Sequence, residues 1–245
     1  MRMGTAITIT TMMKVGMSTE RSLYRLMTWL SPAFPVGAFS YSHGLEWAVE
    51  DGLVPDEARL GDWIEAGLAQ EFGAVGAHQL RAAHDAASAH DAAALLAAIA
   101  EARAWQPTRE FALESLAQGK AFIATLRDVL PPTPALTWAM PILEGEAIAY
   151  PSAVGLAAAL NGVALRETLV AYFQAFTGNL VSAGIRLIPL GQTAGQRIMV
   201  KLEAPILAAA EAALTRDARN VGTAAPMADW ASMKHETQYT RLFRT

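Results

Sequence analysis

Apolar residues recur at three- and four-residue spacings along nearly the whole chain after residue 19, and prolines and glycines divide this pattern into short segments. Such spacing places the apolar residues on one face of an α-helix. Alanine and leucine dominate, and both lose little side-chain freedom in a helix. The pattern therefore predicts an all-α protein, with roughly eight to ten helices in a single domain and a helix in the C-terminal tail.

The chain divides into three parts. Residues 1–18 are rich in threonine and lack the apolar run of a signal peptide, so we expect a flexible leader. Residues 19–228 form the predicted helical domain, which ends in a polar linker from residue 216. Residues 229–245 form a short tail that we expect to dock on a partner. With 53% hydrophobic and 17% charged residues, a chain of 245 residues can bury a sizeable core.

Composition argues against several classes of function. The net charge of −4 disfavours a nucleic-acid-binding protein, which needs a basic face. The absence of cysteine excludes disulfides and thiolate metal sites, and it is consistent with a cytoplasmic protein. The apolar stretch 147–165 is nearly long enough to cross a membrane, but Pro151 and Asn161 interrupt it. We expect a buried central helix and no membrane association, with a membrane span as the alternative.

Motifs of catalysis and phosphate binding are missing from the sequence. Residues 191–197 (GQTAGQR) have loop glycines without the Lys-Ser/Thr of a P-loop. Ser42 and His43 are adjacent, and neighbouring residues on a helix point apart, so they do not predict a nucleophile–base pair. We expect no catalytic residue and no cofactor bound by this chain.

The histidines do not predict a metal site. His78, His84 and His90 are spaced by six residues, which turns each one by about 240° from the last around a helix axis. Their side chains would not converge on one ion, so we expect exposed or locally bonded histidines. No metal ligand is therefore expected in this chain.

One helical stretch carries a polar stripe on an otherwise apolar helix. Asn179, Ser182 and Arg186 follow one another at i, i+3 and i+7, which places them on one face. A buried arginine needs partners, and Glu144 or Glu146 could supply them. The stripe predicts an internal polar network, a seam at a dimer interface or the lining of an internal passage. A small cytosolic enzyme with a pocket near these two glutamates and Arg186 is the alternative function.

The tail is amphipathic. His235, Tyr239 and Leu242 share a face if the tail is helical, and Phe243 lies beside them. Three residues add positive charge to an otherwise acidic protein: Lys234, Arg241 and Arg244. An aromatic, arginine-bearing tail after a polar linker is suited to docking in the groove of a partner. Packing of the tail on its own domain is the alternative.

Three segments together resemble the urease accessory protein UreF family. They are residues 30–46 (LSPAFPVGAFSYSHGLE), 179–196 (NLVSAGIRLIPLGQTAGQ) and 232–243 (SMKHETQYTRLF). Their order and separation agree with that family, and the resemblance covers roughly residues 20–245. Any single segment would be a weak signal, whereas the combination is specific.

The resemblance implies an all-helical fold and a homodimer. It also implies assembly with the accessory protein UreD (UreH) and with the GTPase UreG on apo-urease, where GTP hydrolysis is coupled to nickel insertion. Nickel and GTP would then be bound by the partner complex and not by this chain. The family has been described as containing an internal route for nickel, for which Asn179, Ser182 and Arg186 are a candidate lining.

The resemblance also implies roles for individual residues. Arg241 looks like the family's tail arginine, which joins the tail to its neighbours. Phe39, Tyr41 and His43 lie in a segment that resembles the family's partner- and dimer-associated region. The full set of residues expected at a partner or dimer contact is Phe39, Tyr41, His43, Glu46, His235, Tyr239, Arg241, Leu242 and Phe243.

Overall fold

The computed structural model describes residues 19–222 and 224–245, and each regular element within them is helical. The predicted all-α class is confirmed, while the predicted leader at 1–18 lies outside the described residues. The first helix covers residues 19–29. The elements that follow are η1 (Ala38–Ser40), α2 (Leu45–Glu50), α3 (Glu57–Gln70), η2 (Phe72–Gly76), α4 (Ala77–Ser88), α5 (Ala92–Ala104), α6 (Arg109–Val129), α7 (Pro134–Leu143), α8 (Tyr150–Leu160), α9 (Leu165–Leu187), α10 (Gln192–Thr215), η3 (Ala218–Asn220) and α11 (Pro226–His235).

Polar residues directly before several helices explain where those helices begin. The side chains of Asp56, Asp91, Thr108 and Thr133 each accept a hydrogen bond from a backbone N–H in the first turn of the next helix. Pro134 opens α7, where its missing N–H costs no hydrogen bond. The proline-rich break after α6 therefore also starts α7, a helix that the sequence pattern does not predict.

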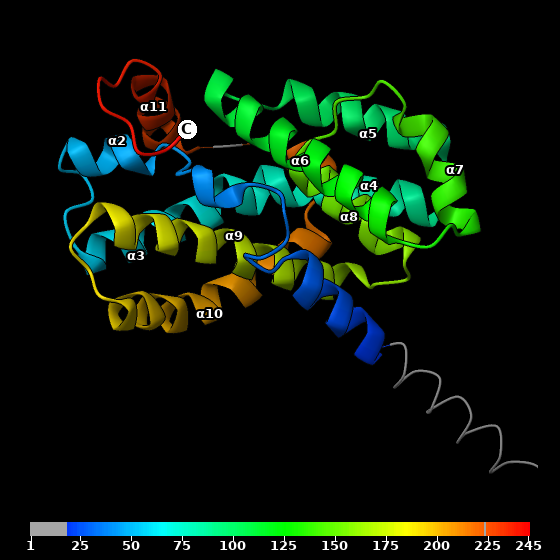
Figure 1. Ribbon diagram of the computed structural model, residues 1–245, viewed down its shortest axis with the longest axis horizontal. Coiled ribbons are helices and arrows are strands. Elements are labelled where there is room, and N and C mark those ends of the chain that lie inside the picture. The colour runs from blue at the N-terminus through cyan, green and yellow to red at the C-terminus, as the bar shows by residue number, and fades with distance from the viewer. Residues whose placement is uncertain (1–18, 223) are drawn as a thin grey trace, which may run out of the picture.

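The centre of the molecule is α8, which packs against α4, α6 and α9 (Figure 1). Its residues Tyr150 to Ala158 are all buried. Gly155 permits a very close approach, because a Cβ atom there would lie 2.1 Å from the carbonyl oxygen of Leu80 in α4. The buried central helix predicted within 147–165 is confirmed. Among the described residues, no helix is both long enough and apolar enough to span a bilayer.

A second group of helices, α3, α9 and α10, packs beside this centre (Figure 1). The short connection 188–191 joins α9 to α10. Gly184 of α9 faces Leu60 of α3, and a Cβ atom at Gly184 would lie 2.3 Å from a methyl carbon of that leucine. This close contact holds α9 against α3, so that the polar stripe of α9 faces the N-terminal segment and the tail.

The tail packs on the domain from which it comes. Its helix, α11, begins at Pro226, three residues before the predicted boundary at 229, and contacts α2 and α6 (Figure 1). It ends at His235, and residues 236–245 follow as an irregular loop. Phe243 returns to the hydrophobic core, where it is 4% exposed. The alternative, packing of the tail on its own domain, is therefore what the structure has at both ends of this loop, at His235 and at Phe243.

Candidate functional site

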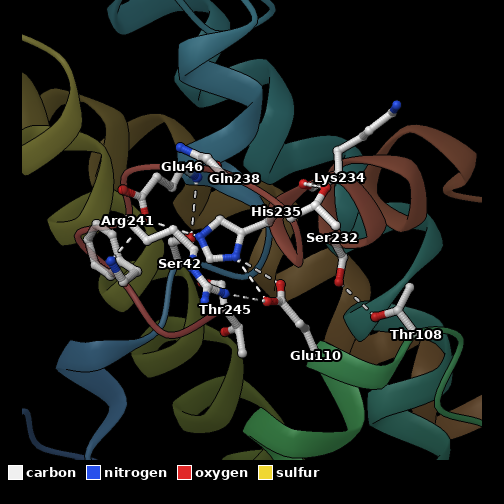
Figure 2. Close-up of polar contacts among 12 residues, drawn as sticks. Ser42, Glu46, Thr108, Glu110, Ser232, Lys234, His235, Gln238, Arg241 and Thr245 are labelled. Atoms are coloured by element: carbon white, nitrogen blue, oxygen red, sulfur yellow. Dashed lines mark hydrogen bonds and ion pairs between the residues drawn. The ribbon is translucent and has the colours of Figure 1, made fainter.

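A fully buried histidine joins the tail to two helices of the domain. The Nδ1 atom of His235 lies 2.9 Å from a carboxylate oxygen of Glu110 in α6, and its Nε2 atom lies 3.0 Å from one of Glu46 in α2 (Figure 2). A neutral imidazole carries only one N–H. Both contacts are favourable only when this Glu46–His235–Glu110 triplet holds an additional proton, on the ring or on a carboxyl group.

The same two carboxylates hold the loop after α11. One oxygen of Glu46 accepts the backbone N–H of Leu242 at 2.6 Å, and the other accepts that of Phe243 at 2.9 Å. An Nη atom of Arg241 lies 3.4 Å from Glu110. Burial raises the pKa of Glu110 despite the opposing influence of His235 and Arg241. The loop is therefore closed by two buried acidic groups of its own domain.

Hydroxyl groups and one close backbone contact complete the attachment. The hydroxyl groups of Ser232 and Thr108 lie 2.7 Å apart, and the Ser42 hydroxyl donates to the carbonyl oxygen of Thr245 at 2.6 Å. Gly44 has φ +75°, and a Cβ atom there would lie 3.0 Å from the backbone nitrogen of Ser232. The segment that carries Ser42 and Gly44 is thus shaped to receive the tail.

A second carboxylate–imidazole–carboxylate triplet lies one turn further along α6. The Nε2 atom of His43 is 2.7 Å from Glu71, and its Nδ1 atom is 3.2 Å from Glu114, which also accepts the hydroxyl of Thr245 at 2.9 Å. The imidazole stacks on Phe111 with ring centres 3.9 Å apart. Burial alone would lower the pKa of His43, but the charges and hydrogen bonds of Glu71 and Glu114 raise it from 6.5 to about 10.

The Glu71–His43–Glu114 triplet borders a small cavity of about 70 Å³. The aromatic rings of Tyr150 and Tyr172 line the same cavity, and burial raises the pKa of both phenols. His43 has both ring nitrogens bonded to carboxylates, so neither nitrogen is available to take a proton from a substrate. The geometry supports a structural role for this histidine.

The polar stripe of α9 faces the N-terminal segment. The Arg186 guanidinium donates to the carbonyl oxygens of Phe39, at 2.9 Å, and Ser182, at 3.2 Å. Its central carbon lies 3.7 Å from the ring centre of Phe39 and 4.3 Å from that of Phe243. Asn179 donates to the carbonyl oxygen of Tyr41 at 3.4 Å, a long hydrogen bond. The stripe therefore links α9 to the segment around η1 and, through Phe243, to the tail.

The prediction that Glu144 or Glu146 pairs with Arg186 is wrong. Glu146 pairs instead with Arg103 at 3.1 Å, and Glu144 is exposed. Carbonyl oxygens and aromatic rings surround the cation, and burial lowers the pKa of Arg186. The pocket suggested for an enzyme near Glu144, Glu146 and Arg186 does not form, because these side chains have separate partners or face solvent.

The three evenly spaced histidines have unrelated surroundings. His78 lies 3.3 Å from Glu101, His84 lies 3.0 Å from the carbonyl oxygen of Val163, and the ring of His90 packs near a tryptophan. Within the described part of the chain, no group of three or more histidine, aspartate or glutamate side chains is arranged to hold a metal ion.

The structure divides the predicted docking residues of the tail into two sets. His235 and Phe243 are buried against their own domain, whereas Tyr239 is fully exposed and Leu242 is 64% exposed. The predicted common helical face is wrong, because α11 ends at His235 and both exposed residues lie in the loop. Tyr239 and Leu242 keep their predicted role as candidate partner contacts, and Arg241 lies between them.

The predicted residues of the N-terminal segment divide in the same way. Tyr41 and Glu46 are buried and His43 is largely buried, so these three face the chain itself. Phe39 is 66% exposed and stacks on Arg186, which leaves one face of its ring open to solvent. Phe39 is therefore the residue of this segment that a partner could reach most directly.

Sequence reasoning missed three carboxylates that hold the triplets together, Glu71, Glu110 and Glu114. A signal for two of them is present in the sequence. Glu110, Glu114 and Gln118 repeat at four-residue intervals and lead to the buried Phe122, so all share one face of α6. Glutamates on the core-facing side of a helix require buried partners. This pattern could have suggested that histidines would face α6.

Comparison with known proteins gives a consistent assignment. The UreF family model matches residues 54–203. A urease accessory protein UreF from Rhodopseudomonas palustris (strain BisB5) is 49% identical over 224 residues, which cover 91% of each chain. A protein of the same name from Bradyrhizobium diazoefficiens is 46% identical over 230 residues, and one from Granulibacter bethesdensis is 44% identical over 226, both covering more than nine-tenths of each chain. The chain belongs to the UreF family of urease accessory proteins.

Proposed function

We propose that this chain is a non-catalytic scaffold of urease maturation. It joins the accessory protein UreD (UreH), recruits and regulates the GTPase UreG, and so assists GTP-dependent nickel insertion into apo-urease. The proposal places the complex in the cytoplasm, with the chain as a homodimer and with nickel and GTP bound by the partners. Membership in the UreF family supports the urease-related role, and the geometry of the tail supports docking.

The observation that carries the proposal is the contrast between neighbouring residues of the tail. His235 and Phe243 are buried, and between them Tyr239 and Leu242 project into solvent. The buried contacts fix the loop before any partner arrives, so little conformational entropy is lost on binding. Exposed aromatic and aliphatic side chains on a fixed loop are well suited to be binding hot spots.

The surroundings of the buried histidines support a scaffold over an enzyme. In each triplet, both imidazole nitrogens contact carboxylates of the same chain. These groups join helices and hold the tail, and their hydrogen-bonding atoms do not converge on a substrate position. In this proposal, regulation of UreG acts by completing or holding the active site of the GTPase.

The experiment compares two double variants of the tagged full-length chain, co-expressed with UreD. Tyr239→Ala with Leu242→Ala removes the exposed tail side chains and leaves the buried contacts intact. Val129→Ala with Val200→Ala is the control, because these valines are 65% and 73% exposed and lie in α6 and α10. We expect the tail variant to bind UreD at least about tenfold more weakly, and the control to bind normally. Equal binding by both variants would overturn the docking role of the tail.

A further inference from the structure

The closed position of the tail depends on the protonation state of the Glu46–His235–Glu110 triplet. Two acidic groups and one imidazole are buried together, and both ring nitrogens are within 3.0 Å of a carboxylate oxygen. With a neutral ring and two carboxylates, one nitrogen lone pair would face a carboxylate oxygen, which is repulsive. The closed tail therefore requires one proton more than these three groups hold in that form.

We infer that closure of the tail is coupled to the uptake of one proton, so that the Glu46–His235–Glu110 triplet is a proton-dependent latch. When the latch is closed, the proton is shared among three buried groups. When the tail opens, His235 enters water and the two carboxylates are hydrated. The inference concerns the isolated chain and does not depend on any partner protein.

The charged groups around His235 come from each element packed against it. Glu46 comes from α2, Glu110 from α6 and Arg241 from the loop of the tail, while Glu236 acts on Glu110 as an additional negative charge. The second triplet, Glu71–His43–Glu114, is one helical turn away and also bonds to the end of the tail through Thr245. Among the described residues, Arg241 is the only cation that contacts the His235 triplet. Its distance from Glu110, 3.4 Å, is longer than either imidazole–carboxylate distance.

Proton linkage fixes how steeply the closing equilibrium constant of the tail changes with pH. An imidazole and two carboxylates in water together hold no additional proton above about pH 6.5. Closing the latch then takes up one proton, and the closing equilibrium constant should fall by about tenfold for each pH unit above about 6.5. Closure becomes more favourable as the pH falls, because the closed form holds the additional proton.

Hydrogen exchange measures this equilibrium directly. The backbone N–H groups of Leu242 and Phe243 are bonded to Glu46 only when the tail is closed. Their protection factors in the full-length chain, corrected for the intrinsic pH dependence of exchange, should fall about hundredfold between about pH 7 and about pH 9. A constant protection factor over this range would overturn the inference.

Glu110→Gln gives the sharpest test, because the amide can donate to Nδ1 of a neutral His235 while Nε2–H donates to Glu46. Every contact is then satisfied without an additional proton. We expect the tail of this variant to stay closed, with protection factors that do not change with pH. A fall parallel to that of the unaltered chain would contradict the latch.

Two further variants keep the result interpretable. His78→Gln alters a histidine that pairs with a half-exposed glutamate, Glu101, and should leave the tail's pH dependence unchanged. His235→Gln removes the imidazole and with it the need for an additional proton, so it should lower the protection of Leu242 and Phe243 and make that protection independent of pH. If Glu110→Gln loses its helical circular dichroism, His235→Gln decides the question, and a retained tenfold slope in it would refute the latch.

Discussion

The guanidinium carbon of Arg186 lies 4.3 Å from the ring centre of Phe243, which joins α9 to the tail across more than fifty residues of sequence. The same group lies 3.7 Å from the ring centre of Phe39. Arg186 thus contacts an aromatic residue of the N-terminal segment and one of the tail. The polar stripe of α9 and the attachment of the tail are therefore parts of one arrangement.

Truncation of this arginine should weaken that arrangement measurably. We expect Arg186→Ala to lower the free energy of unfolding by about 1–2 kcal/mol, because it removes two cation–π contacts and the hydrogen bond to Phe39. Urea denaturation measures the change. Arg103→Ala is the matched control, since its ion pair with Glu146 is partly exposed and should contribute less than about 1 kcal/mol. Equal effects of the two substitutions would contradict the role assigned to Arg186.

Close packing of α8 against α4 leads to a second prediction. A Cβ atom at Gly155 would lie 2.1 Å from the carbonyl oxygen of Leu80, so Gly155→Ala must push two central helices apart. We expect a loss of about 2–4 kcal/mol in the free energy of unfolding. Gly178→Ala is the control, because its Cβ would lie 3.9 Å from the nearest side chain and alanine favours the helix by up to about 1 kcal/mol. A tolerated Gly155→Ala would show that α8 is less tightly packed than described.

Stability should depend on pH through His43. Its pKa in the folded chain is about 10, above the ordinary value of 6.5, so the folded chain binds the proton more tightly. The resulting stabilisation is complete below about pH 6.5 and is lost as the pH rises through about 10, with a slope of at most about 1.4 kcal/mol per pH unit.

A comparison with His43→Gln isolates this contribution. The difference in free energy of unfolding between the chain and this variant, obtained from urea denaturation, should shrink steadily from about pH 6.5 to about pH 9.5. For Gly178→Ala, which alters no ionisable group, the corresponding difference should stay constant over the same range. A difference for His43→Gln that stays constant with pH would show that His43 does not hold its proton more tightly in the folded chain.

Local patterns were sufficient for much of the fold. The uncharged stretch within 147–165 predicted a buried helix because nothing in it requires water, and α8 confirms that prediction. The spacing of Asn179, Ser182 and Arg186 correctly placed them on one face of one helix. Such properties depend on residues within a few helical turns of each other, so they can be predicted from the periodicity of the sequence.

The attachment of the tail could not be predicted in this way. His235 meets Glu46, a residue 189 positions earlier in the chain, and no local spacing encodes that contact. The expectation that Tyr239 and Leu242 continue the helix failed because α11 ends where His235 and Glu46 fix the chain. The prediction of an acidic partner for Arg186 is wrong, since carbonyl oxygens and aromatic faces can also surround a half-buried guanidinium.

We propose that this chain links UreD to UreG. Co-purification tests this link: tagged UreD is isolated from cells that contain UreG, with and without this chain, and the amount of UreG that co-purifies is measured. We expect UreG to be recovered with UreD only when the full-length chain is present. Recovery of equal amounts of UreG without the chain, or of none with it, would contradict the scaffold function.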